Sequence, residues 1–222
     1  MATINLEAAR RRLQDFDFEN LFVEELGWDR HPSCLDLDVE GRRYRLQAVA
    51  EKRGFVVFVC RPADEGEVPA RDIRMKIDSR VTKHAFEHLL IFVDGPHTQQ
   101  VWQFVRRDIG QPLACREFRF TQGQTGEPIV QRLGTIAVSM DEEDQLTILG
   151  VSTRVRRGFD ADVVTKRFYD RFKTHRDALA SLIFGIPDGK DRDWYASVML
   201  DRLMFVYFIQ KKGFLDGDLD YL

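Results

Sequence analysis

The stretch that decides the fold is CLDLDVEGRRYRLQAVAEKRGFVVFVCR, residues 34–61. It contains short runs rich in Val, Leu and Phe, which are separated by Gly-Arg-Arg at 41–43 and Arg-Gly at 53–54. Glycine at such joints adopts the positive φ angles that tight hairpins need. The stretch therefore predicts a meander of three strands.

The segments on either side of the meander predict an α/β domain. Residues 6–26 have apolar side chains at helical spacing with a break near 15–17, which predicts two short helices, and a second helical pattern covers 71–87. Three further strands are predicted by apolar or alternating runs, at 88–94, 99–108 and 116–123. The pair LGTIAVS (133–139) and LTILGVS (146–152) favours a hairpin, with strand–turn–helix as the alternative.

From Phe159 onward the pattern is helical. Residues 159–185 predict one long helix with Asp160 as N-cap and Gly185 past its end, and a loop then leads into a closing helix. We expect a mixed α/β domain over residues 1–155, followed by a C-terminal helical segment over 156–222.

Composition limits the classes of protein to consider. The net charge of −3 and the pI of about 6.0 argue against a uniformly basic nucleic-acid binder but leave room for a local basic patch.

The three cysteines are far apart and form no C-x-x-C pair, so neither a zinc site nor a disulfide framework is indicated. A reducing, cytoplasmic location fits best. No signal peptide is evident, and no apolar run approaches the roughly 18–20 residues that span a bilayer, so no membrane partner is expected.

Carboxylates on the predicted meander suggest metal chemistry. Asp36 and Asp38 share one face of their strand because side chains alternate with period two, and Glu51 and Lys52 end the next strand. Metal-dependent nucleases hold Mg²⁺ between carboxylates on neighbouring strands, with a lysine nearby to orient water. The candidate catalytic residues are therefore Asp36, Asp38, Glu51 and Lys52, with Asp38 and Glu51 as candidate Mg²⁺ ligands.

The spacing of this set also supports a plainer interpretation. Arg53, not Lys52, shares a face with Glu51, and arginine stays protonated, so it is a poor substitute for a water-orienting lysine. A bulge at Arg53 and Gly54 would repair the geometry. Without it, these residues form a solvated or salt-bridged strand edge.

Basic residues gather at two places that could follow a phosphate backbone. The first, at 106–119, interleaves arginines with aromatic residues, and the second lies on the helix predicted after residue 159. The candidate DNA-binding residues are Arg106, Arg107, Lys166, Arg167, Arg171 and Lys173. The alternative for both clusters is an ordinary solvated surface.

The last stretch, WYASVMLDRLMFVYFIQKKGFLDGDLDYL (194–222), is apolar on every side between Leu203 and Ile209. It is similar to a segment of large bacterial restriction–modification proteins of the Eco57I-like (type IIG) class. The similarity is carried by Tyr195, Leu200, Arg202-Leu203, Phe205, Tyr207-Phe208, Gln210-Lys211-Lys212-Gly213 and Leu215. Upstream pieces such as ELGWD, AEKRGFVVFVC and FDADVVTKRFYDRF look like the N-terminal region of the same proteins.

This resemblance implies a nuclease-like fold of the PD-(D/E)xK kind, degenerate here because the E-x-K spacing is lost. It also implies that an S-adenosylmethionine-dependent adenine methyltransferase domain follows. The chain has no N-P-P motif followed by Tyr or Phe and no glycine-rich cofactor loop, so we expect no methylation by this chain alone and no cofactor bound to it.

The expected function is that of a front module of a restriction–modification or phage-defence adenine methyltransferase. It would contribute DNA contact or interdomain packing, with weak or no cleavage activity, and its partners would be DNA and the downstream methyltransferase domain. One alternative is an active Mg²⁺-dependent endonuclease. The other is a protein-interaction module without a DNA role.

Overall fold

The computed structural model describes residues 4–61, 66–108, 110–159, 161–212 and 214, with the backbone alone for 161–167. The chain divides into two compact units, residues 1–160 and residues 161–222. The boundary that the sequence predicts after residue 155 falls inside the last helix of the first unit. Each unit is described separately below.

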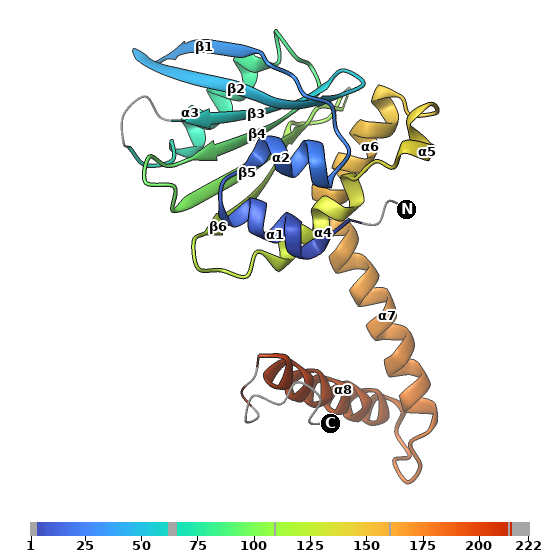
Figure 1. Ribbon diagram of the computed structural model, residues 1–222. Coiled ribbons are helices and arrows are strands. Elements are labelled where there is room, and N and C mark those ends of the chain that lie inside the picture. Colours follow the sequence, from blue (N-terminus) through green and yellow to red (C-terminus); the bar gives the residue numbers. More distant parts are fainter. Residues whose placement is uncertain (1–3, 62–65, 109, 160, 213, 215–222) are drawn as a thin grey trace. The chain divides into compact units, whose positions relative to one another are not determined.

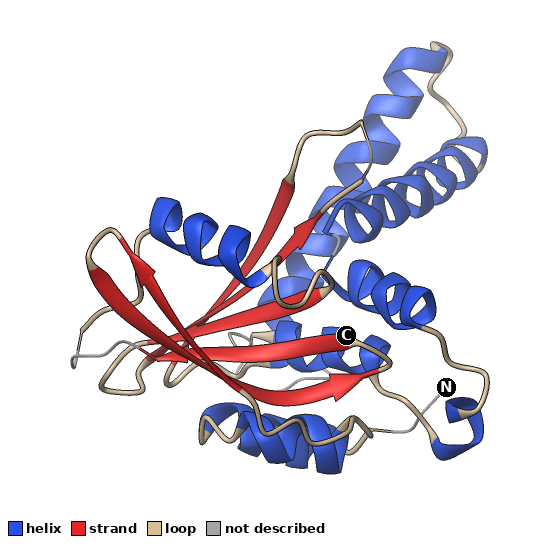
Figure 2. Cartoon of the chain, turned by 90° about the horizontal axis from the view of Figure 1, so that it is seen from above, coloured by secondary structure: helices blue, strands red, loops and turns tan. Residues whose placement is uncertain are grey.

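The first unit is a mixed sheet with helices on both faces (Figures 1 and 2). Its strands are β1 (Cys34–Val39), β2 (Arg42–Lys52), β3 (Phe55–Arg61), β4 (His88–Val93), β5 (Gln99–Arg106) and β6 (Ala114–Thr121). Its helices are α1 (Leu6–Gln14), α2 (Phe18–Asn20), the π-helical turn η1 (Leu21–Glu25), α3 (Arg71–Val81), α4 (Glu127–Ile136), α5 (Met140–Glu143) and α6 (Ile148–Phe159).

The described strands form one six-stranded sheet in the order of the sequence, β1 to β6. Neighbouring strands are antiparallel except β3 and β4, which are parallel and are connected through α3. A parallel pair needs such a crossover. Every residue of β4 is buried, as expected for a central strand covered on both faces.

The predicted meander is confirmed as β1–β2–β3. Lys52 pairs with Phe55 around a two-residue turn in which Arg53 and Gly54 have φ angles of 53° and 89°. Positive φ at both central positions is the requirement of the tight turn that suits twisted strands. The bulge lies upstream, between Ala48 and Ala50, and not at Arg53 and Gly54.

Two apolar cores fill the two sides of the sheet. Helix α3 packs over one side through Ile77 and Val81. Helices α1, α2, η1, α4 and α6 cover the other side, around Trp102 and Phe159. Figure 1 shows α1, α2 and α4 in front of the sheet and α3 behind it.

The hairpin predicted over 133–139 and 146–152 is wrong. These residues belong mainly to α4 and α6, whose buried apolar side chains recur every three or four residues, at 129, 130, 133 and 136 and at 151, 155 and 159. Their β-branched composition favours strands, but helical periodicity and burial against the sheet decide the structure.

The second unit contains α7 (Ala161–Ser181) and α8 (Gly189–Lys211), which contact each other. The predicted N-cap, Asp160, lies outside the described residues. Among the described side chains of this unit, only Ala180, Ala196 and Gln210 are buried. No helix in the described part of the chain is long and apolar enough to cross a membrane.

Candidate nucleic-acid interface

The predicted catalytic carboxylates lie at opposite ends of the β1–β2 ribbon. Asp36 pairs with Arg45 and Asp38 with Arg43, whereas Glu51 is near the other end of β2. At about 3.3 Å per residue, Glu51 is about 20 Å from the level of Asp36 and about 26 Å from that of Asp38.

A metal ion needs its oxygen ligands at roughly 2–2.6 Å. The structure therefore does not bring Asp38 and Glu51 together as a Mg²⁺ pair, and the predicted four-residue centre does not form. Throughout the described residues, no group of three or more His, Cys, Asp or Glu side chains is placed to hold a metal ion.

Glu51 and Lys52 instead take part in local contacts around the β2–β3 turn. A carboxylate oxygen of Glu51 accepts a hydrogen bond from the backbone N–H of Gly54. The Lys52 ammonium group is buried and lies 3.2 Å from Asp29 Oδ1 and 2.5 Å from Glu143 Oε1. The hydrogen bond from Lys52, followed by its charge, lowers the pKa of Glu143. These contacts tie the turn to α5.

Arg107, a predicted DNA contact, is held inside the first unit. Its side chain is 14% exposed, pairs with the Asp78 carboxylate and donates to the Val105 carbonyl at 3.0 Å. Asp78 is also 3.0 Å from His88 Nε2, and both of these residues are buried. A guanidinium group committed to a buried carboxylate is poorly placed to reach a phosphate backbone.

Arg106 is more accessible but is also paired. Its Nε lies 2.8 Å from Asp108 Oδ2, and Arg156 Nη1 lies 2.8 Å from the other oxygen of that carboxylate. Arg171 and Lys173 are exposed on α7. The side chains of Lys166 and Arg167 lie outside the described residues, so the structure does not place these two predicted contacts.

The uncovered part of the sheet presents a basic face that the sequence prediction missed. On the side of the sheet opposite α3, the helices leave β1 and the first half of β2 open. A hollow of about 810 Å³ lies there. Its polar lining includes Asp36, Arg43, Arg45, Gln47 and Arg61. We call these five residues the ribbon face.

The register of the strands decides which charged side chains lie next to each other on the ribbon face. Arg45 lies between Asp36 on β1 and Arg61 on β3. The Cys34 sulfur, 3.2 Å from Arg45 Nε, and then Asp36 raise the pKa of Arg45. Arg61 has no hydrogen bond or ion pair with another described residue. Like charges directly opposite each other destabilise a sheet, so an anion bound between Arg45 and Arg61 would relieve this repulsion.

The period-two spacing of Arg43 and Arg45 was the sequence signal for this face. That signal alone does not predict the face, because its third arginine, Arg61, comes from another strand and only the β2–β3 register brings it beside Arg45.

A different kind of surface occurs in the second unit. Large apolar side chains are exposed along α7, α8 and the residues next to them: Phe168, Tyr169, Leu182, Phe184, Trp194, Tyr195, Leu203, Phe205, Tyr207, Phe208 and Phe214. We call this set the aromatic surface. Large contiguous patches of exposed apolar side chains are typical of interaction sites.

No protein-family model matches the chain, and neither a curated protein nor a solved structure matches it.

Proposed function

We propose that the chain is a front module of a DNA restriction–modification or phage-defence adenine methyltransferase. In this proposal the second unit packs on the methyltransferase domain, and the first unit contacts DNA through the ribbon face. The observation that carries the proposal is the aromatic surface, because α8 is also the segment whose sequence is similar to the entry into the methyltransferase in type IIG proteins.

Packing against another domain explains the composition of α8. A helix that is apolar all round is normally buried, yet Phe205 and Tyr207 on α8 are 63% and 58% exposed. Among the described side chains of α7 and α8 only Ala180, Ala196 and Gln210 are buried, so we expect a further apolar surface to cover the exposed ones. The proposed occupant is the methyltransferase domain of the same polypeptide.

The mixed sheet, with three antiparallel strands followed by a helix and a parallel strand, is compatible with a nuclease-like core of the PD-(D/E)xK kind. Weak or absent cleavage is supported by the register, because the residues facing Asp36 on β2 are Arg45 and, diagonally, Arg43 and Gln47. None of these three supplies the second carboxylate that would be needed to share Mg²⁺ with Asp36.

The docking part is tested by measuring association between this chain and the domain encoded after Leu222 in the same gene, using sedimentation velocity. That domain should contain an N-P-P motif followed by Tyr or Phe. Phe205→Glu should weaken association about tenfold or more, as expected when a buried aromatic anchor is replaced by a charge. Phe86→Glu is the matched control, because Phe86 is 61% exposed but lies in the first unit. No association, or equal loss in both variants, would refute docking through α8.

The DNA part is tested by fluorescence anisotropy with a short duplex at several salt concentrations. Arg45→Ala and Arg61→Ala should each reduce the slope of log K against log salt by about 1 if each arginine contacts a phosphate. Arg30→Ala is the control, because Arg30 is also exposed but pairs with Glu19 elsewhere on the first unit. Affinity that is absent, or that does not depend on salt, would favour a protein-interaction module without a DNA role.

An active Mg²⁺-dependent endonuclease is the second candidate. It is favoured by one observation. The Lys52 ammonium group, next in sequence to Glu51, pairs with the carboxylates of Asp29 and Glu143. Incubating plasmid with the chain and Mg²⁺ or Mn²⁺ should give weak or no cleavage under our proposal, and Glu51→Ala should not change it. Cleavage that is lost in Glu51→Ala would support the endonuclease instead.

A further inference from the structure

We propose that a pocket at the start of α3 binds a terminal phosphate group. This site is on the α3 side of the sheet, opposite the ribbon face, and it does not depend on the proposed function. The proposal rests on the position of the pocket, on three guanidinium groups that line it, and on the way its acidic residues are already engaged.

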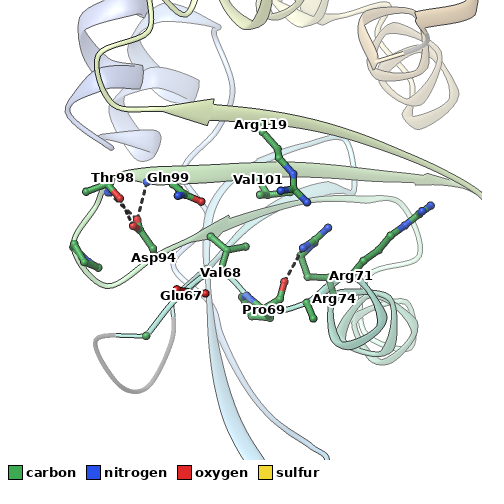
Figure 3. A pocket seen from close by; sticks show the side chains of 13 residues that line it. Glu67, Val68, Pro69, Arg71, Arg74, Asp94, Thr98, Gln99, Val101 and Arg119 are labelled. Atoms are coloured by element: carbon green, nitrogen blue, oxygen red, sulfur yellow. Dashed lines mark hydrogen bonds between the residues drawn. The ribbon is translucent and has the colours of Figure 1, made fainter.

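The pocket lies at the carboxyl edge of the parallel pair β3–β4, where the chain enters α3. Open α/β sheets bind ligands at this edge, because the connections leave a crevice there. The pocket has a volume of about 470 Å³, which is within the range of small-molecule sites. Figure 3 shows Arg71, Arg74 and Arg119 along one side and Asp94 on the other.

The Arg74 side chain lines the pocket and is held in one position by its neighbours. Its side chain is 2% exposed, and it donates from Nε to Gln103 Oε1 at 3.2 Å and from Nη1 to the Pro69 carbonyl at 2.6 Å. Its Nη2 lies 2.8 Å from Glu117 Oε2 but is not aligned for a hydrogen bond. A buried guanidinium held in this way is already ordered before a ligand arrives.

Arg71 and Arg119 supply cationic groups at the rim. Arg71 is 68% exposed and reaches Glu117 only at 3.5 Å. Arg119, on β6, is exposed and has no hydrogen bond or ion pair with another described residue. Guanidinium groups bind phosphate oxygens through two parallel hydrogen bonds, so both side chains have donors available for a ligand.

The start of α3 adds backbone donors. Its N-cap position is Ala70, which has no side-chain oxygen, and no side chain caps this end of the helix. The first N–H groups of a helix have no partner within the helix and attract anions. Ala70 and Arg71 both line the pocket, so this end of α3 faces the proposed ligand.

The acidic residues nearby leave these donors available. Burial alone would raise the pKa of Asp94, but hydrogen bonds from the Thr98 hydroxyl and from the N–H groups of Thr98 and Gln99 lower it overall. This carboxylate is therefore charged but already saturated with donors. Glu117 neutralises the positive charge of Arg74 and part of that of Arg71. Glu67 is the one carboxylate lining the pocket that has no partner among the described residues.

A small group with several oxygens fits this arrangement better than an extended backbone does, because the donors converge from α3 and β6 on one hollow. A terminal phosphate can belong to a free nucleotide or to the 5′ end of a nucleic acid strand. The chemistry of binding is the same in both cases, so the test separates the two sources.

The test is isothermal titration calorimetry on the full chain with pyrophosphate, ATP, and one oligonucleotide in its 5′-phosphorylated and 5′-hydroxyl forms. Saturable binding of at least one phosphate probe is expected. Arg119→Gln should weaken it about tenfold or more, as expected for the loss of charge-assisted hydrogen bonds. Arg42→Gln is the matched control, because Arg42 is also exposed and without a partner among the described residues, but lies on β2 away from the pocket.

Tighter binding of ATP and pyrophosphate than of either oligonucleotide would assign the site to a free nucleotide. Preference for the phosphorylated over the hydroxyl oligonucleotide would assign it to a strand end. The proposal is overturned if no probe saturates, or if Arg42→Gln weakens binding as much as Arg119→Gln. Because Arg119 is exposed and has no partner among the described residues, its substitution should leave the melting temperature unchanged, and loss of binding can then be read as loss of the contact.

Discussion

Replacement of Arg107 by alanine should destabilise the first unit strongly and affect DNA binding only through folding. The Arg107 guanidinium pairs with Asp78, which also receives His88 Nε2 at 3.0 Å. Both nitrogens of the His88 ring face acceptors, since Nδ1 lies 2.7 Å from the Ala85 carbonyl. Within the described residues, the buried Asp78 carboxylate is thus shared by Arg107 and His88.

The expected magnitude follows from burial. The Asp78 side chain is 3% exposed and that of Arg107 is 14% exposed, so removal of Arg107 leaves a carboxylate with little access to water. Removing one member of a buried ion pair costs about 3–5 kcal/mol. Arg107 retains some contact with solvent, which favours the lower end, about 3 kcal/mol. For a chain of this size that corresponds to a fall in melting temperature of about 6–12 °C.

The neighbouring residue provides a matched control. Arg106→Ala also removes an arginine that pairs with an aspartate, but this pair is 38% and 33% exposed, and such pairs contribute about 0–1 kcal/mol. Urea unfolding followed by tryptophan fluorescence measures both variants, because Trp28 and Trp102 are buried in the first unit.

The reasoning fails if Arg107→Ala costs no more than Arg106→Ala. It also fails if Arg107→Ala keeps full stability and loses affinity for duplex DNA. That second result would support the DNA-binding role that the sequence predicts for Arg107.

Other predictions concern the core, an acid-sensitive turn and the cysteines. Phe159→Ala should lower the free energy of unfolding by about 3–5 kcal/mol in urea titrations, because Phe159 is buried and stacks on Trp102. Asp94→Asn should be less stable than the wild type at neutral pH. Because folding lowers the pKa of Asp94 from its ordinary value of 3.8, the difference should shrink as pH falls through that value and below it, and a difference constant from pH 7 to pH 2.5 would contradict this. Burial raises the pKa of the Cys60 thiol to about 12, so a thiol reagent should label exposed Cys34 in the native protein and Cys60 only after unfolding.

Local sequence signals were sufficient for the meander and the central strand. Hairpin glycines, period-two alternation and the apolar run at 89–93 depend on nearest neighbours, and each of these strands formed where it was predicted. The same local reasoning failed for α4 and α6, because β-branched residues such as Val130 and Val155 are tolerated in helices whose apolar face is covered by a sheet.

The candidate sites depended on contacts that the sequence does not encode locally. Arg107 and Asp78 belong to different elements, and only the packing of α3 on the sheet makes Arg107 an internal residue. Likewise, the partner of Asp36 is fixed by the β1–β2 register, which places Arg45 opposite it rather than Glu51. The sequence could supply carboxylates and a lysine in the right order, but not their distances.

The two units differ in how many of their described apolar side chains are buried. The first unit fully buries its largest apolar side chains, including Trp102, Phe22 and Phe92. Its sheet and helices therefore pack as layers around an apolar core, as in other folded domains. The described part of the second unit buries only Ala180, Ala196 and Gln210, although α8 contains an unbroken apolar run from Leu203 to Ile209. A pair of helices that buries so little gains little of the tertiary packing that normally stabilises helices. In the proposed function α8 packs on the methyltransferase domain, so amide hydrogen exchange in α8 should slow when that proposed domain is added, while exchange in β4 stays unchanged. Exchange in α8 that is already as slow as in β4 without a partner would contradict this inference.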